Sequence, residues 1–225
     1  MRSTFWLLTS VALAAAASAS AAPPARVEIT YEVSRNGMLL GEVTHRLEHD
    51  GRAYLITETW KGRGLLALRG SATRVSRGVI AADGLRPLEF SDERTGRNTA
   101  RVRFDWDART VVMQYRGEPR TEPLPERAHD RLAFAFDFAF AGARDVTFDL
   151  LDGRGQSRHR YTIDGRERIT VPAGQFDAVR VVRRTDKDRT ELWLAEGRSL
   201  LPARVLVVDK DGVRIEQVAT RISAQ

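Results

Sequence analysis

Short stretches in which every second residue is apolar, separated by residues typical of tight turns, recur along most of this chain. Residues 27–33 read Val-Glu-Ile-Thr-Tyr-Glu-Val, so apolar and polar side chains alternate without a break. Successive side chains of a strand point to opposite faces, so this two-residue period predicts a β-strand with one buried face. Asn36-Gly37 follows closely and favours a hairpin turn, because both residues tolerate a positive φ angle.

Further stretches of the same kind predict strands over most of the remaining chain. They cover residues 38–47, 52–60, 72–80, 85–92, 99–105, 110–115, 145–151, 156–163, 167–171, 178–185, 189–195, 203–208 and 213–222. Turn residues separate several of them, at Asp83-Gly84, Asp152-Gly153, Asp164-Gly165 and Asp209–Gly212. Many short strands joined by tight turns are typical of antiparallel architectures. We therefore predict an all-β fold, either a curved antiparallel sheet or a partly open β-barrel built as a meander.

One segment, residues 131–140, departs from this pattern because phenylalanine occupies every second position from Phe134 onwards. As a strand, all four rings would share one face. A helix would instead place Phe134 beside Phe138 and separate this pair from the other two rings. The alanines, and Pro125 before the segment, favour a helix start. We predict one short buried helix near residues 126–141.

The N-terminal segment, residues 1–21, has the composition of a secretory leader. A single positive charge at Arg2 precedes an apolar, alanine-rich run, and Ala19-Ser20-Ala21 fits the small-x-small pattern of a signal peptidase site. We expect cleavage after Ala21, with Ala19 as the alternative. The run falls short of the roughly 20 strongly apolar residues that a membrane span requires. Residues 22–225 are then expected to form a single β-rich domain located in the periplasm.

The chain contains no cysteine, which excludes several chemistries at once. Disulfides, zinc ribbons, iron–sulfur clusters, thiol nucleophiles and a lipid-modified N-terminal cysteine all require that residue. A domain without such cross-links must rely on its hydrophobic core and on hydrogen bonds between strands.

The 36 lysine and arginine residues exceed the 30 acidic residues, which gives a formal charge of +6, and nearly all of the basic residues are arginines. Most of them alternate with apolar residues, which predicts outward-facing charges that protect strand edges. Attraction to anionic envelope surfaces is the alternative, and it implies peripheral membrane contact at most. Nucleic acid is not expected as a partner, because the leader exports the protein and no aromatic cluster accompanies a basic stripe.

The sequence carries no motif for catalysis, metal binding or cofactor binding. His45 and His49 are four residues apart, but they fall at the end of a predicted strand and in its turn, where they should diverge. His129-Asp130 resembles part of a catalytic relay, yet no Gly-x-Ser-x-Gly nucleophile elbow occurs. We therefore expect a non-catalytic protein without a metal or cofactor.

A leucine-rich stretch bounded by glycines, residues 62–70, is the strongest candidate for a ligand-binding surface, together with part of the phenylalanine run. The ligand-groove candidates are Leu65, Leu66, Leu68, Phe134 and Phe138. These side chains would line the mouth or interior of a curved sheet, because barrels of moderate size enclose ligand cavities. The alternative is that they fill the hydrophobic core.

Three motifs later in the chain resemble those of a bacterial envelope family. Residues 83–90 resemble its Gly-Leu-x-Pro-x-x-Phe element, and residues 171–178 resemble its Pro-Ala-Gly-x-Phe-x-Ala turn. Trp193 followed by Leu-Pro-Ala-Arg at 201–204 is similar to its closing strand pair. The family is catalogued as domain of unknown function 3108, and the resemblance covers about residues 31–222.

The resemblance implies an exported, largely β-stranded protein with no established activity. Its motif residues are expected to be architectural, as turn glycines, strand-entry prolines and core aromatics. They are Gly84, Pro87, Phe90, Pro172, Gly174, Phe176, Trp193 and Pro202.

These observations favour a periplasmic envelope protein that binds a lipid or another apolar or amphiphilic molecule within a curved sheet. The first alternative is an interaction module that docks on another envelope protein through a sheet edge or surface arginines. The second alternative is an unrecognised hydrolase, which requires His129 or His159 to lie in a cleft beside a carboxylate and a serine.

Overall fold

The computed structural model describes residues 23–64, 67 and 70–225. Within these residues, fifteen strands form one large sheet, which is accompanied by the α-helix α1 and the 3-10 helix η2. The first eight strands are β1 (Arg26–Arg35), β2 (Met38–His49), β3 (Ala53–Gly62), β4 (Ala72–Ala81), β5 (Gly84–Arg94), β6 (Ala100–Asp105), β7 (Thr110–Gln114) and β8 (Arg120–Pro123). The others are β9 (Ala128–Asp130), β10 (Val146–Leu151), β11 (Gln156–Val171), β12 (Gly174–Arg184), β13 (Arg189–Ala195), β14 (Leu201–Val208) and β15 (Arg214–Ala224). The helices are α1 (Ala133–Ala141) and η2 (Glu196–Arg198).

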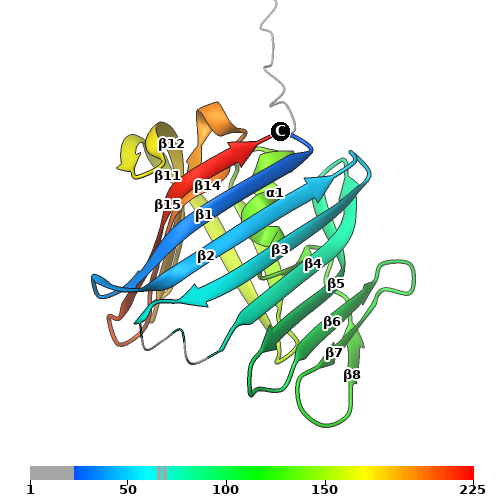
Figure 1. Ribbon diagram of the computed structural model, residues 1–225. Coiled ribbons are helices and arrows are strands. Elements are labelled where there is room, and N and C mark those ends of the chain that lie inside the picture. Colours follow the sequence, from blue (N-terminus) through cyan, green and yellow to red (C-terminus); the bar gives the residue numbers. More distant parts are fainter. Residues whose placement is uncertain (1–22, 65–66, 68–69) are drawn as a thin grey trace, which may run out of the picture.

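The sheet is a meander in which nearly every strand pairs with its neighbour in sequence (Figure 1). The exception is the pairing of the first strand with the last, where β1 and β15 run antiparallel and Ile29 lies opposite Ile222. This pairing joins the two halves of the chain into one continuous sheet. All strand pairs are antiparallel except β9 and β10. The predicted curved antiparallel sheet is therefore confirmed.

The β-barrel alternative is wrong, because the sheet does not close. Its outer strands are β8 and β9, and within the described residues no ladder joins them. β9 has only three residues and runs parallel to β10. β8 has four residues and ends at Pro123, which has no backbone N–H to donate. Both outer strands are thus short, and the sheet remains open between them.

Side-chain and backbone packing brings the two ends of the sheet together instead. Gly153, in the turn between β10 and β11, lies against the backbone of β6 and β7. A side chain at this position would sit 2.9 Å from the backbone of Arg101 and 3.0 Å from the carbonyl oxygen of Gln114. The hairpin tip therefore docks on the opposite arm of the sheet without adding a strand to it.

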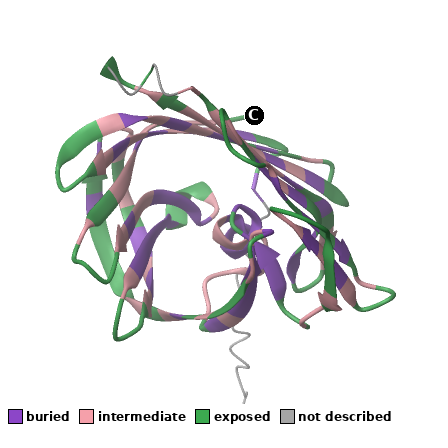
Figure 2. Ribbon diagram, turned by 90° about the horizontal axis from the view of Figure 1, so that it is seen from below, coloured by how far each residue is buried: buried purple, intermediate pink, exposed green. Residues whose placement is uncertain are grey.

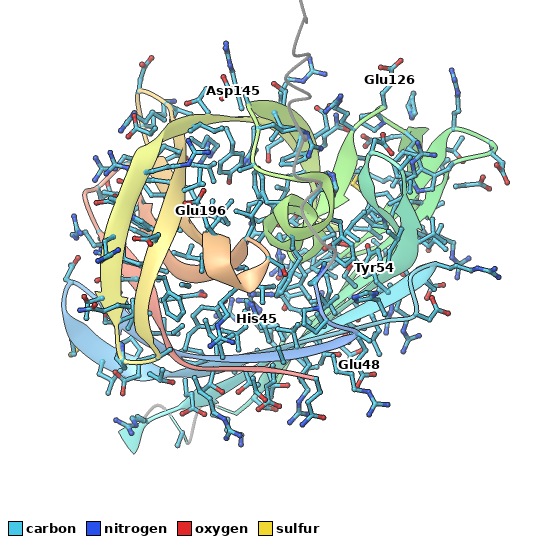
Figure 3. All side chains as sticks on the ribbon, turned by 90° about the horizontal axis from the view of Figure 1, so that it is seen from above. His45, Glu48, Tyr54, Glu126, Asp145 and Glu196 are labelled. Atoms are coloured by element: carbon cyan, nitrogen blue, oxygen red, sulfur yellow. The ribbon has the colours of Figure 1, made fainter. Side chains whose placement is uncertain are left out.

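The single α-helix lies inside the curl of the sheet, as the views from below and from above both show (Figures 2 and 3). The predicted helix is confirmed, but α1 begins at Ala133 instead of near residue 126, because β9 occupies residues 128–130. Asp137 is the only polar residue of α1, and it is buried. A helix that is apolar on all sides must be covered on all sides, which explains its place in the interior.

The hydrophobic core has two parts on either side of α1. The larger part gathers inward side chains of β1–β7, including Ile29 and Ile56, and side chains of β11–β15 such as Trp193, together with Phe136 of the helix. The smaller part lies under β10–β14 and contains Phe138, Phe148 and further aliphatic residues. The helix therefore fills the middle of the curl and contacts both arms.

One predicted turn is wrong. Asp164-Gly165 does not reverse the chain, and β11 runs through it as a strand of 16 residues. The register against β12 shifts between Ile163 and Arg166, which marks a bulge at this point. Gly165 has a φ of 118°, a value that a glycine adopts without strain, so the pair bends the strand instead of ending it.

Candidate functional site

A pocket of about 360 Å³ opens on the concave face of the sheet. It lies where β1, β3 and β5 end and β4 begins, so it sits at one mouth of the curl. Its lining residues are Val33, Val43, Glu58, Trp60, Gly70, Ser71, Ala72, Arg74, Arg94, Thr95, Arg97 and Gln217. The volume falls within the range of about 300–1,000 Å³ that is usual for small-molecule sites.

The apolar part of the pocket comes from three adjacent strands. Val33 of β1 and Val43 of β2 are buried, and the half-buried ring of Trp60 on β3 completes this surface. The ring packs over Gly41, where an added side chain would lie 3.0 Å from the outer edge of the indole. Gly41 therefore provides the space that the tryptophan ring occupies, which sets the ring's position in the pocket.

The polar part of the pocket is a chain of ion pairs across β2, β3 and β4. Nε2 of His45 lies 2.9 Å from Oε2 of Glu58, and Arg74 donates to the other oxygen of the same carboxylate. His45 is buried on the inner face of β2, whereas Glu48 of the same strand is exposed (Figure 3). Burial acts to raise the pKa of Glu58, but the hydrogen bond from His45 and the charge of Arg74 outweigh it and lower the pKa.

The chain of ion pairs continues onto β5 through a second buried carboxylate. Nε of Arg74 lies 3.4 Å from Asp92, and Arg94 donates to both oxygens of Asp92 at 2.9 and 2.8 Å. Burial acts to raise the pKa of Asp92, but the hydrogen bonds from Arg94 and the charge of Arg74 lower it below its ordinary value. Both acids are therefore ionised at neutral pH and hold the two arginines in the pocket wall.

The structure separates the ligand-groove candidates predicted from sequence. Leu65, Leu66 and Leu68 lie outside the described residues, but Gly70 and Ser71 at the end of the same connection line the pocket. Phe138 is fully buried against Phe148 and Tyr161 in the smaller core. The ring of Phe134 is half-buried and stacks on Tyr161 at 5.6 Å. Neither phenylalanine lines the pocket, and both pack in the core beneath β10 and β11.

The motif residues at the start of β5 anchor the helix and a neighbouring loop. Gly84 has a φ of 128° and lies under Asp137, whose carboxylate accepts the backbone N–H of Leu85 at 2.7 Å. The carbonyl of Pro87 accepts a 2.7 Å hydrogen bond from the indole of Trp106, and Phe90 is buried in the larger core.

The later motif residues have similar positions. Pro172 lies in the turn between β11 and β12, Gly174 is the first residue of β12, and Phe176 packs against the larger core. Trp193 is buried, with its indole N–H donating to Glu167 at 2.8 Å. The carbonyl of Pro202 accepts a 2.6 Å hydrogen bond from Tyr31 across the sheet.

These motifs belong to a recognised family. Residues 30–218 match the model of the family described as "Protein of unknown function (DUF3108)". The chain belongs to the DUF3108 family. The match spans the three motifs that resemble this family and most of the sheet, and the family's description names no activity.

Two solved structures are similar to this DUF3108 chain. The first is a Bacteroides fragilis protein described as exported, with a YmcC-like fold. It has a TM-score of 0.42 and 14% sequence identity, and the alignment covers 90% of this chain and 100% of that protein. The second is a Parabacteroides distasonis protein described as a lipoprotein. It has a TM-score of 0.38 and 11% sequence identity, and the alignment covers 91% of this chain and 98% of that protein. No curated protein matches the chain significantly. None of the helices in the described part of the DUF3108 chain has the length and apolarity needed to cross a membrane.

The histidines do not form a metal site in the described part of this DUF3108 protein, where no three potential ligand side chains gather. His45 belongs to the ion-pair chain, whereas His49 lies beside Phe140 and bonds to the carbonyl of Pro23. His129 is buried edge-on against Phe148, and burial lowers its pKa to about 3. His45 and His49 therefore belong to separate local structures.

One serine and one histidine do meet. Oγ of Ser157 lies 2.8 Å from Nε2 of His159, two residues along the same face of β11. Nδ1 of His159 is buried without a hydrogen-bond partner among the described residues, so no carboxylate orients the ring as in a catalytic triad. Burial and the nearby charge of Arg183 lower the pKa of His159 to about 4. The pair therefore has two members of a triad and lacks the third.

Sequence reasoning missed the pocket arginines because the alternation on β4 is ambiguous. Both Arg74 and Val75 lie in the same predicted strand, and the apolar residue suggests the inward face. In the structure Arg74 points into the curl, and Val75 lines a depression on the outer face. The available signal was Trp60, an aromatic residue directly before the glycine-bounded leucine stretch.

Proposed function

We propose that this protein binds an amphiphilic molecule, such as a lipid, in the pocket at the mouth of the curved sheet. The observation that carries the proposal is the division of one pocket into two chemical halves. Val33, Val43 and Trp60 supply an apolar surface from β1–β3, and arginines on β4, on β5 and after β5 supply hydrogen-bond donors. A site of this kind suits a molecule with one apolar and one polar part.

A binding role, and not a catalytic one, is part of this proposal. Both oxygens of Glu58 are engaged, one by His45 and one by Arg74. Asp92 is engaged in the same way by Arg94 and faces Arg74. Carboxylates held ionised by hydrogen-bond donors and by arginine charges are suited to fixing side-chain positions and poorly suited to moving protons.

The first test measures apolar binding directly. Titration with the neutral fluorophore N-phenyl-1-naphthylamine should give saturable fluorescence enhancement, and native mass spectrometry of protein isolated from cells should show a co-purified amphiphile. Ala72→Leu fills the pocket and should abolish the enhancement. Thr73→Leu places the same side chain on the outer face of β4 and should leave it intact. Equal binding by both variants, or none by the unmodified protein, would contradict the proposal.

We also propose that the protein is exported to the periplasm. The support is the leader at residues 1–21, with its single basic residue, alanine-rich run and small-x-small end. N-terminal sequencing of protein from an osmotic-shock fraction should begin at Ala22. Recovery of protein with an intact Met1 from the cytosol would contradict export.

A further inference from the structure

The turn after β5 carries an arginine at the pocket rim whose charge is not neutralised by any residue that the structure describes. Arg97 is exposed and has no acidic side chain within ion-pairing distance among the described residues. The other two guanidinium groups of the pocket pair with two carboxylates, those of Glu58 and Asp92, and Asp92 also lies 3.5 Å from Arg154. The arginines at the pocket therefore outnumber its carboxylates, which makes the pocket positively charged.

The position of this arginine is set by contacts between its turn and the connection that follows β3. The backbone N–H of Thr95 donates to the carbonyl of Ser71 at 3.1 Å, and the N–H of Ser71 donates to Oγ1 of Thr95 at 3.1 Å. The N–H of Arg97 donates to the carbonyl of Arg94 at 3.0 Å, which closes the turn. Arg97 thus projects from a turn that is tied down on both sides of the pocket rim.

Arg94, which also lines the pocket, has N–H groups that no described residue accepts. Its Nε and Nη2 groups bond to Asp92, and within the described residues its Nη1 group has no protein acceptor. A guanidinium carries five N–H donors in a fixed plane, and Asp92 accepts one from Nε and one from Nη2, so three donors of Arg94 remain for a ligand next to Arg97, two of them on Nη1. Oxyanions such as phosphate and carboxylate are the acceptors that match this arrangement.

From this geometry we infer that the ligand is an anionic amphiphile, with a phosphate or carboxylate headgroup held by Arg97 and Arg94 and an alkyl chain lying against Trp60. This inference rests on the proposed function and adds the charge class of the ligand. A cationic headgroup is disfavoured, because Glu58 is the only acidic residue lining the pocket and both of its oxygens are engaged.

Isothermal titration calorimetry on the exported protein, residues 22–225, below the critical micelle concentrations, separates the headgroup inference from the proposed function. Dodecyl phosphate and dodecanoate should bind, whereas dodecyl maltoside and dodecyltrimethylammonium should bind about tenfold more weakly or not at all. Inorganic phosphate alone should not bind measurably. Equal binding of all four dodecyl compounds would overturn the headgroup inference and leave the proposed function intact. No binding of any of them would overturn the proposed function itself, and full competition by inorganic phosphate would make the site a simple phosphate site.

Two arginine variants test the named residue. Arg97→Gln should weaken dodecyl phosphate binding about tenfold and leave the weak binding of dodecyl maltoside unchanged, because it removes only the charge at the rim. Arg103→Gln is the matched control, since Arg103 is exposed on the outer face of β6 and lies 4.0 Å from Glu89. Equal effects of the two variants would overturn the assignment of Arg97.

Discussion

The hydroxyl of Ser76 on β4 donates a 2.5 Å hydrogen bond to the carboxylate of Asp130. The other oxygen of Asp130 accepts the backbone N–H groups of Leu132 and Ala133, at 2.8 and 2.9 Å. Tyr54 extends the network from β3 with a 3.2 Å contact to Ser76. One buried carboxylate therefore caps the start of α1 and ties the helix to the sheet that curls around it.

This carboxylate should make stability depend on pH. Burial raises the pKa of Asp130 from 3.8 to about 6, so the folded protein binds its proton more tightly than the unfolded chain. The stabilisation is complete below about pH 4 and is lost as the pH rises through 6, with a total near 3 kcal/mol. Asp130→Asn keeps the shape and removes the titration. The stability of this variant relative to the unmodified protein should therefore rise between pH 4 and 7, as measured by urea unfolding.

A second prediction concerns the ion-pair chain. Glu58→Ala leaves His45 and Arg74 without their shared carboxylate, and we expect a loss of about 3–5 kcal/mol at pH 7. The pKa of Glu58 is lowered, so the loss should shrink as the pH falls below about 4.5. Glu89→Ala removes an exposed acid of the outer face and should cost less than about 0.5 kcal/mol. Similar losses of stability for both variants would show that the buried carboxylate contributes no more than an exposed one.

A third prediction tests the contact that holds the curl together. Gly153→Ala forces a side chain against the backbone of β6 and β7 at a φ of 81°, and should cost about 2–4 kcal/mol. Gly155→Ala is the control in the same hairpin, because an added side chain there meets nothing within 4 Å. Thermal unfolding should show a clear drop for the first variant and a change within about 1 kcal/mol for the second. Equal melting temperatures would mean that the hairpin tip is not docked.

A fourth prediction separates core from ligand surface within the phenylalanine run. Phe138→Ala should destabilise the protein by about 3–5 kcal/mol, because the ring is fully buried among Phe148 and Tyr161. Phe134→Ala should cost less than half as much, because its ring is only half-buried. Urea unfolding and fluorophore binding should be measured on both. A Phe138→Ala protein with normal stability and lost binding would place this residue in a ligand site after all.

Local patterns predicted the secondary structure well where one face of a strand is buried. The alternation at residues 27–33 and the Asn36-Gly37 turn correspond to β1 and to its hairpin with β2. The same reasoning failed at Asp164-Gly165, because a glycine with positive φ serves a bulge as readily as a turn. It also failed to orient β4, where Val75 faces outwards and Arg74 faces the pocket.

By itself, the sequence determined the strand-rich fold, the helix within the phenylalanine run and the family, because these depend on period-two alternation, turn residues and short motifs that act over a few positions. Only the tertiary structure decided that β1 pairs with β15, that the sheet stays open, and that Arg74, Arg94 and Trp60 share one pocket. Those outcomes depend on contacts between residues far apart in the chain. Local periodicity carries no information about which distant strands meet, or which face of an ambiguous strand such as β4 turns inwards.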